Sequence, residues 1–109
     1  MRFPARLLSA CLFIGVSVSA STAQAAGNVA KGEELARQVC ARCHNVEPSG
    51  PFKLFPPSFA AIAVYRSPEQ IRGKILYPQL HSGMPQLSSV LTPDGVVDLV
   101  AYITSLEKP

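Results

Sequence analysis

The pentapeptide Cys40-Ala41-Arg42-Cys43-His44 constrains this chain more than any other feature. Two thiols at this spacing, on the turn that follows a helix, can each add across one vinyl group of the same porphyrin. The histidine beside the second thiol then lies under the iron as its proximal ligand. The sequence therefore predicts one covalently bound haem c, attached at Cys40 and Cys43, with His44 as a metal ligand.

Three other uses of closely spaced cysteines are alternatives. A redox dithiol expects a strand before the motif and a βαβ pattern around it, whereas the residues upstream of Cys40 have helical spacing. A structural zinc site needs four ligands, but residues 26–109 hold two cysteines and two histidines, and one of the histidines directly follows Cys43. A plain disulfide suits an oxidising compartment. The complete pentapeptide favours haem over all three.

Residues 1–25 have the composition of a secretory signal peptide. Arg2 and Arg6 form a short basic region, an apolar run covers residues 7–18, and Ala23-Gln24-Ala25 is an A-x-A cleavage site. We therefore expect an exported, periplasmic protein whose mature domain is residues 26–109. The apolar run is shorter than the about 20 residues of a spanning helix, so no stable membrane insertion is expected after cleavage. A retained anchor is the alternative.

The mature domain is small for a self-sufficient core, because removing 25 residues from the 109-residue chain leaves 84. A covalently fixed haem would add a large apolar surface at its centre, as disulfides or metals do in other small domains. Eight basic and seven acidic residues give the mature domain a formal charge of +1, and two haem propionates would bring it to about −1. This balance indicates no nucleic-acid partner.

Local signals predict an all-α domain of four helices, because no stretch has the alternation of a strand. Polar residues open three of these helices, at Asn28, Ser67 and Thr92. The second helix is the short apolar run from Phe59 to Tyr65. The third helix should end before Pro78, and the last has a broad apolar stripe for packing on the haem and on the first helix. Gly95, in the first turn of the last helix, is an unfavourable residue without an evident reason.

Irregular loops are expected at residues 45–58, which are rich in proline, and at residues 79–91. The second loop contains Met84, the one methionine besides Met1, between Gly83 and Pro85. A thioether ligand favours ferrous haem and raises the reduction potential. We therefore predict Met84 as the second metal ligand. Ligation by His81 and a five-coordinate iron are the alternatives.

Together these motifs resemble the bacterial class I cytochromes c over essentially the whole mature domain. The resemblance implies that the first and last helices cross closely, with Gly32 and Leu35 against Leu99, Tyr102 and Ile103. It also implies that a proline carbonyl holds the second nitrogen of the proximal histidine. Pro57 is the matching residue here, although Pro56-Pro57 stands where relatives often have Gly-Pro.

The resemblance further implies contact between a haem propionate and the polar residues Tyr65 and Arg66, although two solvated side chains are the simpler interpretation. With His44 and Met84 both on the iron, no site is open to a substrate. We therefore expect an electron-transfer protein and not an enzyme, a monomer that meets redox partners transiently. Arg42 and Lys53 are candidate docking residues, or ordinary solvated ones. A haem-based ligand sensor, a weak peroxidase and a fixed haem subunit of a periplasmic dehydrogenase or oxidase complex are the alternatives.

Overall fold

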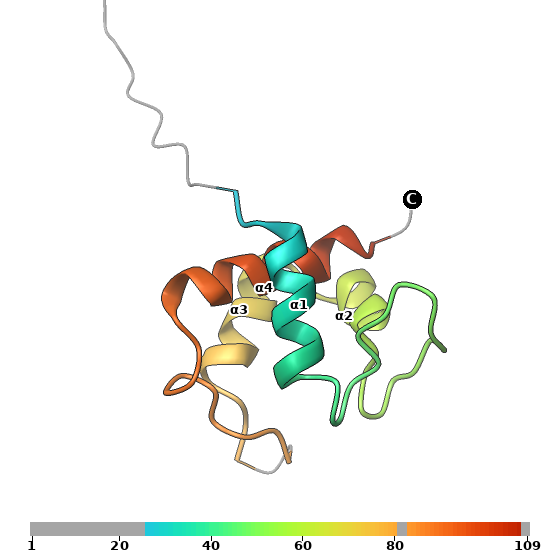
Figure 1. Ribbon diagram of the computed structural model, residues 1–109. Helices are drawn as coiled ribbons and strands as arrows, with labels where there is room; N and C mark the ends of the chain where they lie inside the picture. Colours follow the sequence, from blue (N-terminus) through green and yellow to red (C-terminus); the bar gives the residue numbers. More distant parts are fainter. Residues whose placement is uncertain (1–25, 81–82, 108–109) are drawn as a thin grey trace, which may run out of the picture.

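The computed structural model describes residues 26–80 and 83–107, and the expected signal peptide and His81 lie outside them. The domain has four helices (Figure 1): α1 (Val29–Val39), α2 (Phe59–Tyr65), α3 (Pro68–Leu76) and α4 (Pro93–Ser105). Within the described ranges there is no strand, and residues 54 and 57 form an isolated bridge. The all-α fold is therefore confirmed. No helix in this part of the chain has both the length and the apolar character needed to cross a membrane.

α1, α3 and α4 begin where the capping residues predict, and α2 begins at Phe59, as expected, with Ser58 as its cap. The Asn28 side chain accepts the N–H of Lys31 at 3.0 Å. Ser67 and Gln70 form a complete capping box, in which each side chain accepts the other residue's backbone N–H. Such reciprocal bonds satisfy backbone donors that a helix start otherwise leaves unpaired. Local sequence alone thus predicts where α1 and α3 begin.

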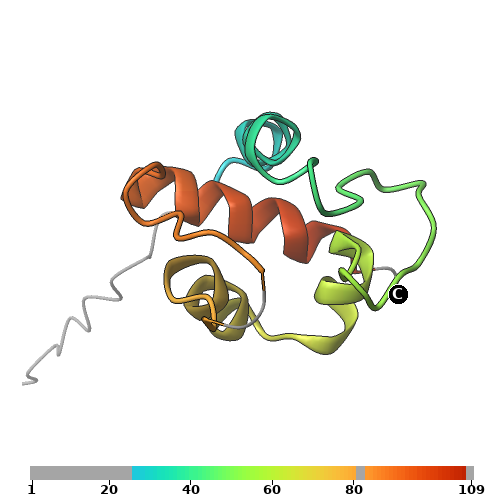
Figure 2. The ribbon, with the colours of Figure 1, turned by 90° about the horizontal axis from the view of Figure 1, so that it is seen from below.

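α4 is the centre of the domain, because it contacts each of the other three helices. Figure 2 shows α1 crossing one side of α4 while α2 and α3 lie on the other. The buried face of α4 includes Val96, Leu99, Tyr102 and Ile103. This face shares one core cluster with Phe59 from α2 and with two isoleucines of α3, Ile71 and Ile75.

The crossing of α1 over α4 depends on Gly32. A Cβ at this position would overlap the carbonyl of Asp98 and lie 2.8 Å from the Cβ of Tyr102. Only glycine lets the two backbones approach so closely. The expected close crossing and the expected approach of Gly32 to Tyr102 are confirmed, and Gly32 also faces Asp98, which was not expected.

The same crossing of α1 over α4 explains why residue 95 is a glycine. A side chain there would meet the Leu35 side chain of α1 at 3.1 Å and the hydroxyl of Thr92 at 3.2 Å. Gly95 therefore makes room for a core leucine from another helix and for the capping side chain of its own helix. This benefit offsets the cost of glycine in a helix, about 1 kcal/mol.

Candidate haem site

The pentapeptide forms a compact turn at the end of α1. Cys40 is the C-cap, with its N–H bonded to the carbonyl of Ala36 at 2.8 Å. The Cys40 carbonyl then accepts the N–H of Cys43 at 3.2 Å and that of His44 at 3.0 Å. Cys40 is half-buried and Cys43 is exposed. The turn therefore brings both attachment residues and the histidine together.

The His44 ring is oriented by one strong contact. Its Nδ1 lies 2.7 Å from the carbonyl oxygen of Pro57. A carbonyl can only accept, so Nδ1 carries the proton and the lone pair of Nε2 is left for a metal. This is the contact that the resemblance implied for Pro57, and Pro56 in place of glycine does not prevent it.

The loop that follows the pentapeptide is fastened to the core by bonds that the sequence interpretation missed. The Tyr102 hydroxyl donates to the carbonyl of Val46 at 2.6 Å in a buried position. The backbone N–H of Phe59 donates to the carbonyl of Asn45 at 2.9 Å. The Phe59 ring lies with its centroid 5.7 Å from that of His44 and 6.3 Å from that of Tyr102. The backbone next to His44 is therefore held from α2 and from α4.

One signal for the Tyr102 contact is present in the sequence. Along the buried stripe of α4 the other large side chains are aliphatic, and Tyr102 alone carries a hydroxyl. A buried tyrosine hydroxyl normally finds a hydrogen-bond partner. The sequence therefore predicts that the Tyr102 hydroxyl needs a partner. It does not predict that the partner is Val46, which lies 56 residues away in sequence.

A second fastening lies at the surface. Arg37 on α1 makes two hydrogen bonds to the Glu47 carboxylate, each 2.9 Å long, and one of 2.8 Å to Glu33. The bonds and negative charge of Glu47, with a smaller effect of Glu33, raise the pKa of the guanidinium above its usual value. Arg37 therefore ties α1 to the loop three residues after His44.

Met84 comes from the other loop. Gly83 before it has φ of +72°, in the left-handed region that favours glycine, and Pro85 follows. The Met84 side chain is half-buried and packs against the same core cluster as Cys40. Met84 and the pentapeptide thus pack against one core cluster, although Met84 lies 40 residues beyond His44 in sequence.

The residues present fit a large, flat apolar group. The two loops that follow the pentapeptide and α3 expose apolar side chains to an unusual extent, with Phe55 97 % and Leu80 92 % exposed. Large exposed apolar surface in a soluble domain normally marks a binding site. Burial raises the pKa of the Cys40 thiol to about 11, so this sulfur behaves as an apolar group near neutral pH. A thioether, which carries no charge, suits that environment.

Residues 27–103 match the family model described as cytochrome C oxidase, cbb3-type, subunit III. The chain belongs to this family of c-type cytochromes. No curated protein and no solved structure matches it. As a member of the family, this cytochrome binds haem c covalently through Cys40 and Cys43, and it serves haem-based electron transfer.

Proposed function

We propose that this cytochrome is a periplasmic carrier of single electrons, not an enzyme, with His44 and Met84 as the two axial ligands of its haem. The observation that carries the proposal is the 2.7 Å contact of His44 Nδ1 with Pro57, because it directs Nε2 away from the protein backbone and toward a metal. Met84 would close the opposite face. With both positions taken by protein side chains, the iron has no place for a substrate.

The haem supplies an iron that cycles between the ferrous and ferric states. The protein keeps the surroundings of that iron the same in both states. Pro57 holds the tautomer and the direction of the His44 ring, while Tyr102 and Phe59 hold the adjacent backbone. Fixed ligands suit an electron carrier, because little has to be rearranged when the charge changes.

An electron needs a route to the surface, and Cys43 supports one. Cys43 is exposed and so is its neighbour Arg42, so the haem edge attached there lies near solvent. We infer that redox partners dock at this edge. Such encounters are transient and use small surfaces, which agrees with a monomer. The signal-peptide features of residues 1–25 support the periplasmic location.

A second candidate function follows from the description of the matching family. The chain could be a fixed haem subunit of a cbb3-type oxidase, which would receive electrons and pass them within the complex. Gel filtration after mild solubilisation separates the two functions: a carrier elutes alone, whereas a subunit elutes with its complex.

An absorption spectrum of the purified protein in both oxidation states tests the ligand set. His/Met ligation gives the ferric form a weak far-red charge-transfer band from methionine sulfur on haem iron. A high-spin ferric spectrum without this band would overturn the proposal. It would favour a ligand sensor or a weak peroxidase with an open sixth position.

A further inference from the structure

One peptide group connects His44 to the loop that follows the pentapeptide. Its carbonyl, that of Pro57, lies 2.7 Å from His44 Nδ1. Its N–H, that of Ser58, donates to the carbonyl of Lys53 at 2.9 Å. We call this group the 57–58 peptide. It accepts a hydrogen bond on one side and donates one on the other, so that His44, the 57–58 peptide and Lys53 form a chain of two hydrogen bonds.

The two bonds of this chain strengthen each other, because each polarises the peptide group between them. A peptide whose N–H donates to Lys53 presents a more negative carbonyl oxygen to the His44 ring. A stronger acceptor at Nδ1 makes the imidazole a more basic ligand. The bond on the Lys53 side of the 57–58 peptide therefore affects the ligand strength of His44 on the other side.

The side chain of Ser58 holds the 57–58 peptide against Lys53. It is 1 % exposed. Its Oγ accepts the N–H of Lys53 at 3.2 Å and that of Ala61 at 3.3 Å, and the hydroxyl donates to the Lys53 carbonyl in a longer contact of 3.5 Å. A buried hydroxyl with partners for both its donor and its acceptor sites has little freedom to reorient. Ser58 thus fixes the geometry of the hydrogen-bond chain.

These contacts exceed what a helix cap requires. Ser58 is the N-cap of α2, and its bond to Ala61 serves that helix. Its contacts with Lys53, five residues earlier, lie outside the helix and close the turn that carries the Pro57 carbonyl. Burial also sets Ser58 apart, since the N-caps of the other three helices are exposed: Asn28, Ser67 and Thr92. A second role for Ser58 follows from this difference.

We propose that Ser58 is a positioning residue for the haem. Through Lys53 and the 57–58 peptide it sets the strength of the Pro57–His44 bond, and thereby the reduction potential of the iron. The inference rests on the proposed ligation of the iron by His44. A more basic imidazole favours the ferric state, which carries the larger positive charge, so the hydroxyl of Ser58 lowers the potential.

The test uses the holoprotein variant Ser58→Ala, which removes the hydroxyl from a buried site with little change in volume. Two measurements report on the His44 ring: the reduction potential, and the Nδ1–H resonance in proton NMR of the diamagnetic ferrous form. We expect a higher potential and an Nδ1–H resonance at lower chemical shift, because the bond to Pro57 becomes weaker. Exchange of this proton with solvent should become up to about tenfold faster, the factor to which one hydrogen bond corresponds.

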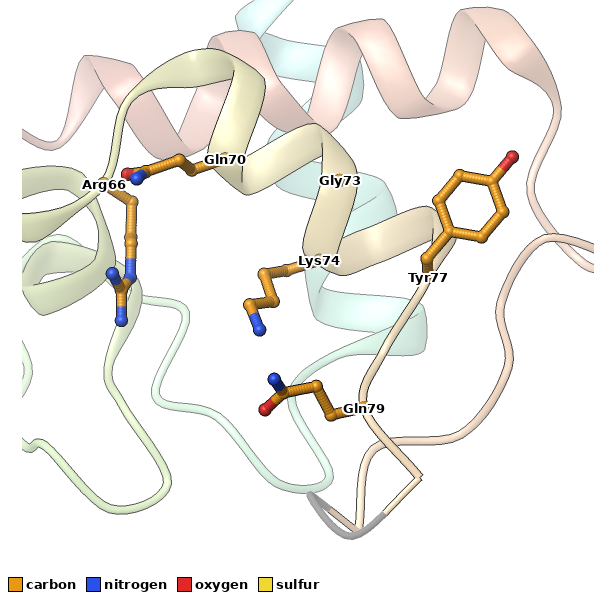
Figure 3. A pocket seen from close by; sticks show the side chains of 6 residues that line it. All are labelled: Arg66, Gln70, Gly73, Lys74, Tyr77 and Gln79. Carbon is orange, nitrogen blue, oxygen red and sulfur yellow. The ribbon is translucent and has the colours of Figure 1, made fainter.

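Ser67→Ala is the matched control, because it makes the same change at the N-cap of the next helix. The Ser67 hydroxyl accepts the N–H of Gln70. Figure 3 shows this part of α3, where Gln70 lines an open pocket of about 340 Å³ together with Arg66 and Lys74. The Ser67 cap thus lies at the surface and has no bond to the His44 loop. Both variants should lose the stability of a helix cap, but only Ser58→Ala should change the potential and the Nδ1–H resonance.

Both changes in Ser58→Ala, with neither in Ser67→Ala, support the proposal. If Ser58→Ala loses stability but keeps the wild-type potential and Nδ1–H resonance, Ser58 is only a helix cap and the proposal is wrong. A lower potential in Ser58→Ala, or equal shifts in the two variants, would also overturn it.

Wild-type holoprotein provides an independent measurement where Ser58→Ala yields none. If Ser58 holds the whole chain, the His44 Nδ1–H and the Ser58 amide N–H open in the same event and have similar protection from hydrogen exchange. An unprotected Ser58 amide beside a protected Nδ1–H would overturn the proposal. A His44 ring without the large ring-current shift of a haem ligand would instead refute the proposed ligation, so the two failures are recognised separately.

Discussion

The loop on the histidine side and the loop on the methionine side are held in different ways. Residues 44–59 are fastened by directional polar contacts, above all Pro57 on His44 and Tyr102 on Val46. In the described part of the other loop, Leu87 and Leu91 are buried and Met84 is partly buried, and the carbonyl of Leu87 accepts the N–H groups of Val90 and Leu91. The bond to Pro57 fixes the direction of the His44 ring, whereas apolar contacts tolerate rearrangement. Of the two proposed ligands we therefore expect Met84 to be the more easily displaced.

Removal of the covalent attachment should have the largest effect, because loss of the haem affects both the His44 loop and the Met84 loop. We expect Cys40→Ala with Cys43→Ala to abolish covalent haem and to leave a domain with too small a core to fold stably. Haem staining of a denaturing gel measures the attachment, and circular dichroism measures the helix content. Stain that stays on the polypeptide would contradict the assignment of these two cysteines.

Met84→Ala should remove the proposed thioether ligand and leave the contacts of the His44 loop intact. We expect a lower reduction potential, because a thioether favours ferrous haem, and rapid binding of cyanide at the opened position. Unfolding of the histidine side should be little changed. His81→Ala is the control and should behave like wild type. The opposite pattern, with cyanide binding opened by His81→Ala and not by Met84→Ala, would make His81 the ligand.

The sequence was sufficient to predict those features whose causes lie within a few residues. Caps such as Ser67 with Gln70 act over three residues, and the thiols and the histidine of the pentapeptide are neighbours. The features it missed depend on partners brought together by the fold. Gly95 has no visible purpose until Leu35 arrives from α1, and the Tyr102 hydroxyl has no visible partner until the fold brings the carbonyl of Val46 to it.

Tyr102→Phe tests the strongest contact of the histidine side. The change leaves the buried carbonyl of Val46 without its donor, which costs about 1–3 kcal/mol of unfolding free energy. Denaturant unfolding of the holoprotein measures the loss. Tyr77→Phe, which alters a residue 76 % exposed, is the matched control and should have no effect. Equal stability of the two variants would show that the Tyr102 bond contributes nothing.

Alkaline pH should reduce the stabilisation of the folded state by the Tyr102 hydroxyl. Burial, with the negative charges of Glu33 and Glu47, raises the pKa of its phenol in the folded state. A raised pKa means that the folded state holds the proton more tightly, so this stabilisation is present below the unfolded value of about 10 and is lost as the pH rises through the folded value. The difference in unfolding free energy between wild type and Tyr102→Phe should therefore shrink above about pH 10. A constant difference up to about pH 11 would contradict this.

Arg37→Gln should have the smallest effect, and it sharpens the comparison for that reason. The Arg37–Glu47 pair fastens the same loop from α1, whereas the core contacts fasten it from α2 and α4. Its side chains are exposed, and ion pairs in water are weak and screened by salt. We expect a slight loss of stability at low ionic strength that disappears in concentrated salt, with the far-red methionine band unchanged. A loss that equals that of Tyr102→Phe and persists in salt would mean that the histidine loop is held from the surface. The buried hydroxyl of Tyr102 would then not be its main anchor.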